Sequence, residues 1–286
     1  MHKTDNNWTT VIEPRQRLLQ LNLREVWQYR DLCRLLVRRS ITTQYKQTLL
    51  GVLWFVIQPL FTTAMYMVVF GGIAGLSTDG LPQPLFYLAG ISLWNYFADS
   101  MTKNANTFVD NASIFGKVYF PRIVMPLATV ISHLLRLAIQ LSLFLVIYAI
   151  YQIWIMPGAL HTNGAILLLP LLIVMLAGHS LAFSMLFSSC TTKYRDLQVM
   201  LSFVVGLWMY ATPVIYPLSA IENSKLHTLM LLNPISSIIE TFRYGMLGVG
   251  EMNWGSLAYS FVLMLVLLLV ALVTFNKVQR DFMDHV

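Results

Sequence analysis

Long apolar runs separated by short polar segments extend along the chain from residue 49 onward. A helix that crosses a membrane needs about 20 mainly apolar residues. Six runs approach this length, near 49–70, 84–101, 121–150, 164–187, 198–216 and 256–275. The third is too long for a simple crossing, so we expect it to tilt or to continue into water. The pattern predicts an all-α polytopic membrane protein with six transmembrane helices, which form a single permease-like domain over residues 49–286.

The segment between the last two runs, residues 217–255, is moderately apolar but is broken by Asn233-Pro234 and by several glycines. Irregular backbone at membrane depth is tolerated only where protein or a water-filled cavity satisfies its polar groups. We therefore expect short re-entrant or interfacial helices before the last span, and an ordinary surface loop is the alternative.

Residues 1–48 form a basic head with a different pattern. Apolar side chains recur there at helical spacing, at Val26, Tyr29, Leu32, Cys33, Leu36 and Val37. A basic amphipathic helix of this kind lies in the membrane surface, where arginines reach lipid phosphates. We expect this lipid-headgroup role for Arg30, Arg34, Arg38 and Arg39. The alternative is an ordinary soluble helix that covers another part of the protein.

Composition and charge agree with a membrane protein and fix an orientation. Hydrophobic residues make up 57% of the chain and charged residues 11%, whereas a soluble domain carries about 25% charged residues. A cytosolic enzyme and a disordered protein are thereby excluded, and two cysteines do not make a disulfide scaffold. With both termini in the cytoplasm, sixteen Lys and Arg lie in inside segments and two in outside segments. The positive-inside rule therefore predicts a multi-pass protein of the cytoplasmic membrane with cytoplasmic N and C termini.

Catalytic motifs are missing from the sequence. It contains no GxxxxGK[ST] phosphate loop, no HExxH and no GxSxG. The six histidines have no metal-ligand spacing, and no span carries paired carboxylates for acid–base chemistry. We expect a chain that is not an enzyme, holds no metal or cofactor and has no catalytic residues.

A few polar and aromatic residues fall inside the predicted spans. An Arg near the middle of a membrane costs about 2.5–3.5 kcal/mol, so Arg136 should face a cavity or an interface. If it lies near a span end it can instead extend toward the headgroups. Aromatic residues usually gather at membrane interfaces, but flat rings can also line a passage for sugars. The candidates for a channel lining are Tyr66, Phe97, Asp99, Arg136, Trp208 and Tyr210.

Five strings of sequence, taken in order, resemble one family. They are QYKQTLLGVLWFVIQPL at the first span, FGKVYFPRIVMPL, KYRDL, ATPVIYP, and LNPISSIIETFRYGMLG before the last span. Together they resemble the permease subunit of ABC-type exporters that move O-antigen, capsule and teichoic-acid polymers. The resemblance extends over nearly the whole chain.

The resemblance implies a homodimer with a channel between its two copies, driven by two copies of a separate cytosolic ATPase. ATP and magnesium would then bind to that partner, and a lipid-linked polysaccharide, not a nucleic acid, would be the cargo in a bacterial inner membrane. The family's interface helix corresponds to residues 24–39 and its coupling helix to residues 104–118.

The resemblance also implies roles for single residues. Contacts with the ATPase would come from Asn111, Phe115, Lys117, Lys193, Tyr194, Arg195 and Asp196. The exit gate on the outside would include Asn233, Pro234, Glu240 and Arg243. Glu240 and Arg243 are three residues apart, so on a helix they could pair on one face.

Three other functions stay open at the level of sequence. A permease of the same superfamily could export drugs or small lipids, although the outside loop at residues 71–83 is too short for the large domain that such exporters often carry. A polytopic glycosyl- or acyltransferase would need an acidic or His-based cluster near a membrane face. A channel would need a repeated polar face.

Overall fold

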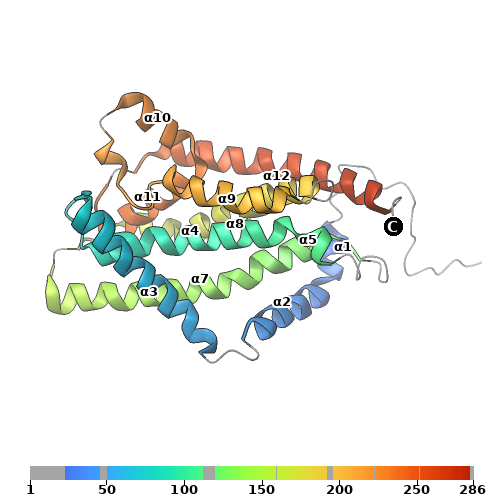
Figure 1. Cartoon of the computed structure of the whole chain (residues 1–286), viewed down its shortest axis with the longest axis horizontal. Helices are drawn as coiled ribbons and strands as arrows, with labels where there is room; N and C mark the ends of the chain where they lie inside the picture. Colours follow the sequence, from blue (N-terminus) through green and yellow to red (C-terminus); the bar gives the residue numbers. More distant parts are fainter. Residues whose placement is uncertain are drawn as a thin grey trace, which may run out of the picture.

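The computed structural model describes residues 23–45, 50–111, 120–158, 160–191, 196–221, 223–250 and 252–283. All regular elements within these residues are helices. The long ones run side by side in Figure 1, with α3 (Trp54–Tyr66) crossing them obliquely. They are α4 (Gln83–Ala105), α7 (Val124–Ile150), α8 (Leu169–Thr191), α9 (Leu197–Tyr210) and α12 (Trp254–Met283).

Short helical turns extend several of these helices. A 3-10 turn, η1 (Gly51–Leu53), precedes α3, and the π-helical turn η2 (Met67–Ile73) continues it. The π-helical turn η3 (Tyr151–Ile155) continues α7, and the 3-10 turn η4 (Gly164–Leu168) leads into α8. The third apolar run is thus a helical segment of 32 residues, or about 48 Å. It is longer than one perpendicular crossing requires, as the sequence predicted.

Four helical segments are long and apolar enough to cross a membrane, namely Gly51–Ile73, Val124–Ile155, Gly164–Thr191 and Trp254–Val278. Each coincides with a predicted span. A fifth apolar helix, α9, is shorter because it ends at Tyr210, before the prolines at 213 and 217. The remaining predicted span corresponds to α4, which has 23 residues but carries Asp99 and Lys103. The all-helical class is confirmed, whereas the number of six spans stays a prediction.

The two ends of the bundle differ in what they carry. The short helices α1 (Leu23–Gln28) and α5 (Thr107–Asp110) and the last turns of α12 gather at one end, which we call the head end (Figure 1). The π turn after α3 and the helix α10 (Ser224–Leu232) lie at the opposite end, which we call the loop end. Helix α1 and the end of α12 therefore lie on the same side of the bundle.

Helix α4 is the centre of the packing. It lies against α3, α7, α8, α9 and α11 (Pro234–Leu247), and Leu85, Leu88, Phe97 and Met101 have no exposed surface. Because neighbours surround it, α4 can carry polar side chains that a lipid-facing helix could not. That explains why its mean hydropathy is lower than that of the four apolar segments named above.

The apolar face of the basic head packs on the protein. Helix α2 (Arg30–Tyr45) runs along the head-end part of α7. Its apolar residues, together with Val26 and Tyr29 before it, pack against a cluster that includes Phe108, Val124, Met185 and Phe275. The predicted helical face is confirmed. Its contacts correspond to the alternative of a helix that covers another part of the protein, and the exposed face is the one that bears arginines.

Two short helices occupy most of the segment before the last span. Helix α10 begins after Asn223, whose side chain accepts the backbone N–H groups of Lys225 and Leu226. Helix α11 begins at Asn233-Pro234, with the Asn side chain as its cap, and proline at the first helical position has the backbone angle that a helix needs. All but one of the residues of α11 are buried, so α11 is a packed element and not a surface loop, whereas α10 has no buried residue.

Candidate functional site

Arg243 of α11 is the most deeply buried cation among the described residues. Its exposed fraction is 2%, and its guanidinium carbon lies 3.7 Å from the centre of the Phe86 ring. Nη1 donates to the carbonyl oxygen of Pro213 at 2.5 Å, and Nη2 donates to those of Val214 at 2.7 Å and Phe86 at 3.3 Å. We call this set of contacts the arginine clamp. It joins α11 to the first turn of α4 and to the chain just after α9.

The local sequence explains why carbonyls are available there. The prolines after α9 interrupt helical hydrogen bonding, so the carbonyl groups of Pro213 and Val214 need other donors. Gly90 of α4 leaves room for the guanidinium, because a Cβ atom at this position would lie 2.7 Å from Nη2 of Arg243. A glycine in α4 and a break after α9 are thus the two conditions for the clamp.

Glu240 completes the clamp on the same helix. Its carboxylate lies 3.3 Å from Nη1 of Arg243, which confirms the predicted pairing of residues three apart. Burial raises the pKa of Glu240 above its ordinary value, and the positive charge of Arg243 opposes this rise. Asn233 holds the start of α11, since its side-chain amide donates to the Ala211 carbonyl at 2.9 Å and to the Thr212 hydroxyl at 2.8 Å.

A second charged group lies inside the bundle, where α3, α4 and α7 meet. Arg136 of α7 forms an ion pair with Asp99 of α4 and donates to the side-chain oxygen of Gln58 of α3 at 3.0 Å. Its guanidinium carbon lies 5.1 Å from the centre of the Phe55 ring. Arg136 therefore faces neighbouring helices, and its charge is compensated there.

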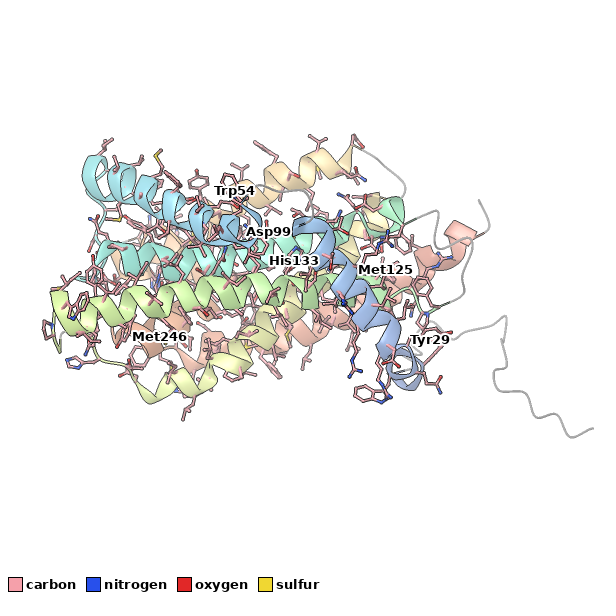
Figure 2. All side chains as sticks on the ribbon, turned by 90° about the horizontal axis from the view of Figure 1, so that it is seen from below. Tyr29, Trp54, Asp99, Met125, His133 and Met246 are labelled. Carbon is pink, nitrogen blue, oxygen red and sulfur yellow. The ribbon has the colours of Figure 1, made fainter. Side chains whose placement is uncertain are left out.

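A polar depression of about 330 Å³, widely open to the outside of the bundle, adjoins this ion pair, and we call it the junction cavity. Its walls are Asp99, Thr102, Lys103, Asn106, His133 and Arg136. In Figure 2, Asp99 and His133 lie near the place where α2 ends and α3 begins with Trp54. The sequence singled out Asp99 and Arg136 separately but did not bring them together.

The aromatic candidates for a channel lining have different environments. Phe97 has no exposed surface, and its ring packs edge-on against Trp208 at 5.3 Å and Phe183 at 6.2 Å. Phe97 therefore packs in the core of this structure. Tyr66 is half-buried, with its hydroxyl 3.4 Å from the sulfur of Met209, whereas Tyr210 is exposed.

The head arginines lie on the open side of α2. Arg34 pairs with Asp31 at 3.3 Å, Arg30 lies 5.7 Å from the centre of the Trp27 ring, and Arg38 and Arg39 are exposed. A mainly apolar groove of about 310 Å³ separates α2 from Ile131 of α7, with Arg34 and Arg38 at its edge. Burial raises the pKa of the Cys33 thiol in its wall, which agrees with a packing role for this cysteine.

The residues expected to contact an ATPase are only partly described. Asn111 follows α5 at the head end and donates to the Thr107 carbonyl at 2.9 Å. Asp196 is exposed and immediately precedes α9. The other candidates, Phe115, Lys117, Lys193, Tyr194 and Arg195, lie outside the described residues.

Several residues of these sites were not anticipated. Gln58 was part of a quoted string, and an amide within an apolar run is a signal that could have been used. Near the end of α4, Thr102 and Lys103 follow Asp99 by one helical turn, and Asn106 follows them by another. This spacing could have been recognised from the sequence. Among the described residues, no three His, Cys, Asp or Glu side chains are placed to hold a metal ion.

The fold is all helical in its described part, and four of its segments are long and apolar enough to cross a membrane. The Arg243–Glu240 and Arg136–Asp99 pairs lie among these packed helices. These features define a multi-pass membrane protein. Residues 31–247 match the ABC-2 type transporter family, and the chain belongs to this family of transporter permeases.

Named relatives narrow the class further. The chain is 30% identical to the O-antigen export system permease protein RfbA of Myxococcus xanthus, over 77% of this chain and 82% of the relative. It is 26% identical to the protein of the same name from Klebsiella pneumoniae, over 89% and 94% of the two chains. It is 23% identical to the polysialic acid transport protein KpsM of Escherichia coli, over 83% and 90%.

Proposed function

We propose that this chain is the permease subunit of an ABC transporter that exports a lipid-linked polysaccharide, such as O-antigen, across the bacterial inner membrane. The observation that carries the proposal is similarity over most of the chain to relatives named as O-antigen and polysialic acid transport proteins. The short connection between η2 and α4 also supports it, because there is no room for a large outside domain.

The membrane arrangement follows from the two ends of the bundle. In the proposed topology α4 and α9 complete six spans, and the head end faces the cytoplasm because inside segments then hold sixteen of the nineteen Lys and Arg. Apolar side chains project from α3 and α9, among them Phe61, Met65, Phe203 and Leu207. These faces suit contact with lipid and with a second copy in a homodimer.

Energy comes from a separate ATPase, two copies of which bind ATP and magnesium. Asn111, Phe115 and Lys117 belong to one contact with it, and the segment from Lys193 to Asp196 belongs to the other. Closure of the ATPase dimer pushes on these segments and shifts the packed helices as rigid bodies.

The polymer moves from the head end to the loop end. Arg30, Arg34, Arg38 and Arg39 meet the phosphates of the lipid carrier with their planar forks of donors. The passage for the polymer is lined by the remaining channel candidates, namely Asp99, Arg136, Tyr66, Trp208 and Tyr210. The exit gate contains Asn233, Pro234, Glu240 and Arg243, and its arginine clamp keeps α11 fixed to α4.

Export is tested with inside-out vesicles that contain the chain and its ATPase. Addition of ATP should move the lipid-linked polymer into the vesicle lumen, where it is protected from added glycosidase. An ATPase whose phosphate-loop lysine is replaced is the control. Unchanged glycosidase sensitivity in the presence of ATP and active ATPase would refute polysaccharide export.

The ATPase contact is tested by reversing charge. The double change Lys193→Glu and Arg195→Glu should abolish copurification of the ATPase, because two attractive contacts become repulsive. Lys277→Glu, at the head end of α12, is the matched control and should copurify normally. Retention of the ATPase by the double variant would contradict this contact.

A further inference from the structure

The junction cavity contains polar groups that the folded chain does not use. We propose that it is a binding subsite for one or two neutral sugar rings near the cytoplasmic end of the transport path. The proposal rests on the proposed function, in that the sugar belongs to the exported polymer. It assigns a ligand class to Asn106, Thr102 and His133, beside the Asp99–Arg136 pair.

The charges around the cavity favour a neutral ligand over an anion. The ammonium of Lys103 lies 2.7 Å from the carboxylate of Asp110, and Arg136 is paired with Asp99. Each cation thus has its own carboxylate, and the four charges sum to zero. A phosphate would have to displace one of these carboxylates, whereas a hydroxyl group requires no such exchange.

The residues around the junction cavity include both a hydrogen-bond donor and a hydrogen-bond acceptor that have no partner among the described residues. Nε of Arg136 is a donor and Oδ1 of Asn106 is an acceptor, and within the described part of the chain neither buried atom has a hydrogen-bond partner. A buried polar atom without a partner destabilises the fold. Both atoms are covered by neighbouring protein atoms, so Asn106 and Arg136 must turn toward the cavity to reach a ligand. Each sugar hydroxyl both donates and accepts, so the hydroxyls of one ring then match the donor of Arg136 on α7 and the acceptor of Asn106 after α4.

Size and position agree with this ligand. A volume of about 330 Å³ is at the lower end of the range for small-molecule sites, about 300–1,000 Å³. Asp99 precedes the last residue of α4 by six positions, so it lies about 9 Å from the head end of that helix. A polymer that enters at the head end would meet this cavity early in its path.

The cavity is also shaped by rigid elements. Asp99, Thr102 and Lys103 project from α4, and His133 and Arg136 project from α7. His133 is 7% exposed, and Ser132 beside it is linked to Ser40 of α2 at 3.5 Å. Sites built on packed helices hold their polar groups in place before the ligand arrives, which lowers the entropic cost of binding.

The experiment measures binding directly on the full chain in lipid nanodiscs. Saturation-transfer NMR is recorded with the methyl glycosides of glucose, galactose, mannose and rhamnose, and phosphorus NMR with inorganic pyrophosphate. The test variant is Asn106→Leu, which removes the unused acceptor and fills the cavity with an apolar side chain. Gln152→Leu is the matched control, because it removes another buried and unpartnered amide oxygen in η3, near the loop end.

We expect at least one glycoside to bind the wild-type chain, and Asn106→Leu to weaken that binding by at least about fivefold, as for loss of one hydrogen bond. Gln152→Leu should bind like the wild type. Should Asn106→Leu fail to fold, Thr102→Val replaces it, since valine has the same shape without the hydroxyl.

Three results would overturn the subsite: no glycoside signal, an equal signal in Asn106→Leu, or binding of pyrophosphate in place of the glycosides. None of them bears on the vesicle assay. Loss of glycoside binding together with intact ATP-driven export would reject the subsite and leave the proposed function standing. Glycoside binding by a wild-type chain that does not export polymer would support the subsite and reject the proposed function.

Discussion

The arginine clamp makes a strong prediction about stability. Replacement of Arg243 by Met keeps most of the side-chain volume but removes all donors to the carbonyls of Pro213, Val214 and Phe86. It also leaves Glu240 buried without its ion-pair partner. Removal of one partner from a buried pair costs about 3–5 kcal/mol. A loss of that size lowers the melting temperature by roughly 10 °C in a chain of this length.

The loss of stability in Arg243→Met should depend on the charge of Glu240 and therefore on pH. Without Arg243, burial and the negative charge of Asp79 raise the pKa of the Glu240 carboxyl, and of the opposing causes only the backbone hydrogen bond from Leu218 is left, so this pKa rises further above the unfolded value. A raised folded pKa means that the folded state binds the proton more tightly, so stability is greatest at acidic pH and is lost as pH rises through the folded pKa. Arg243→Met should therefore be less harmful at acidic than at neutral pH, and the double variant with Glu240→Gln should lose less than Arg243→Met alone.

The assay is thermal unfolding in detergent, followed by tryptophan fluorescence at several pH values. Lys225→Met is the control, because Lys225 is an exposed cation on neighbouring α10 and surface changes stay within about 0.5 kcal/mol. A melting temperature for Arg243→Met within 2 °C of the wild type, about the shift expected for a surface change, would refute the clamp. Equal losses in the single and double variants would show that the carbonyl contacts, and not the ion pair, stabilise α11.

Two further predictions concern packing and lipid contact. Gly90→Ala should cost about 1–3 kcal/mol by overpacking, because its Cβ would lie 2.7 Å from Nη2 of Arg243. Gly206→Ala in α9 has open space around it and should stabilise the chain by up to about 1 kcal/mol in the same unfolding assay, because alanine is favoured over glycine inside a helix. The change of Arg38 and Arg39 to Gln should remove about 1 kcal/mol of headgroup attraction each and slow polymer export in vesicles roughly thirtyfold at limiting substrate. Normal export with normal membrane insertion would contradict the headgroup role.

The helices could be predicted from the sequence because their signal is local. The run near 256–275 lies within α12, and the run near 84–101 differs from α4 by only a few residues at each end. The fifth run was predicted to continue to residue 216, but α9 ends at Tyr210. Apolar content alone does not show that two nearby prolines end a helix.

The candidate site was predictable only where its partners are close in sequence. Glu240 and Arg243 lie on one helical face, and their pairing followed from spacing. Asp99 and Arg136 are 37 residues apart on antiparallel helices, so their contact depends on how α4 and α7 are aligned. Phe97 shows the same limit, because an aromatic residue in a span has the same local pattern whether it faces a passage or the core.

Helix α12 connects the two ends of the molecule as one rod. Near its start, Ser260 donates to the Pro234 carbonyl at 2.8 Å, at the first turn of α11; near its other end, the ring of Phe275 lies 4.7 Å from that of Phe108 in α5. Its 30 residues span about 45 Å. The arm from the Phe275 contact to the start of the helix at Trp254 is about 32 Å long, so a tilt of about 5° at that contact displaces the far tip by about 3 Å. The loop end can thus respond to a small push at the head end without any local unwinding.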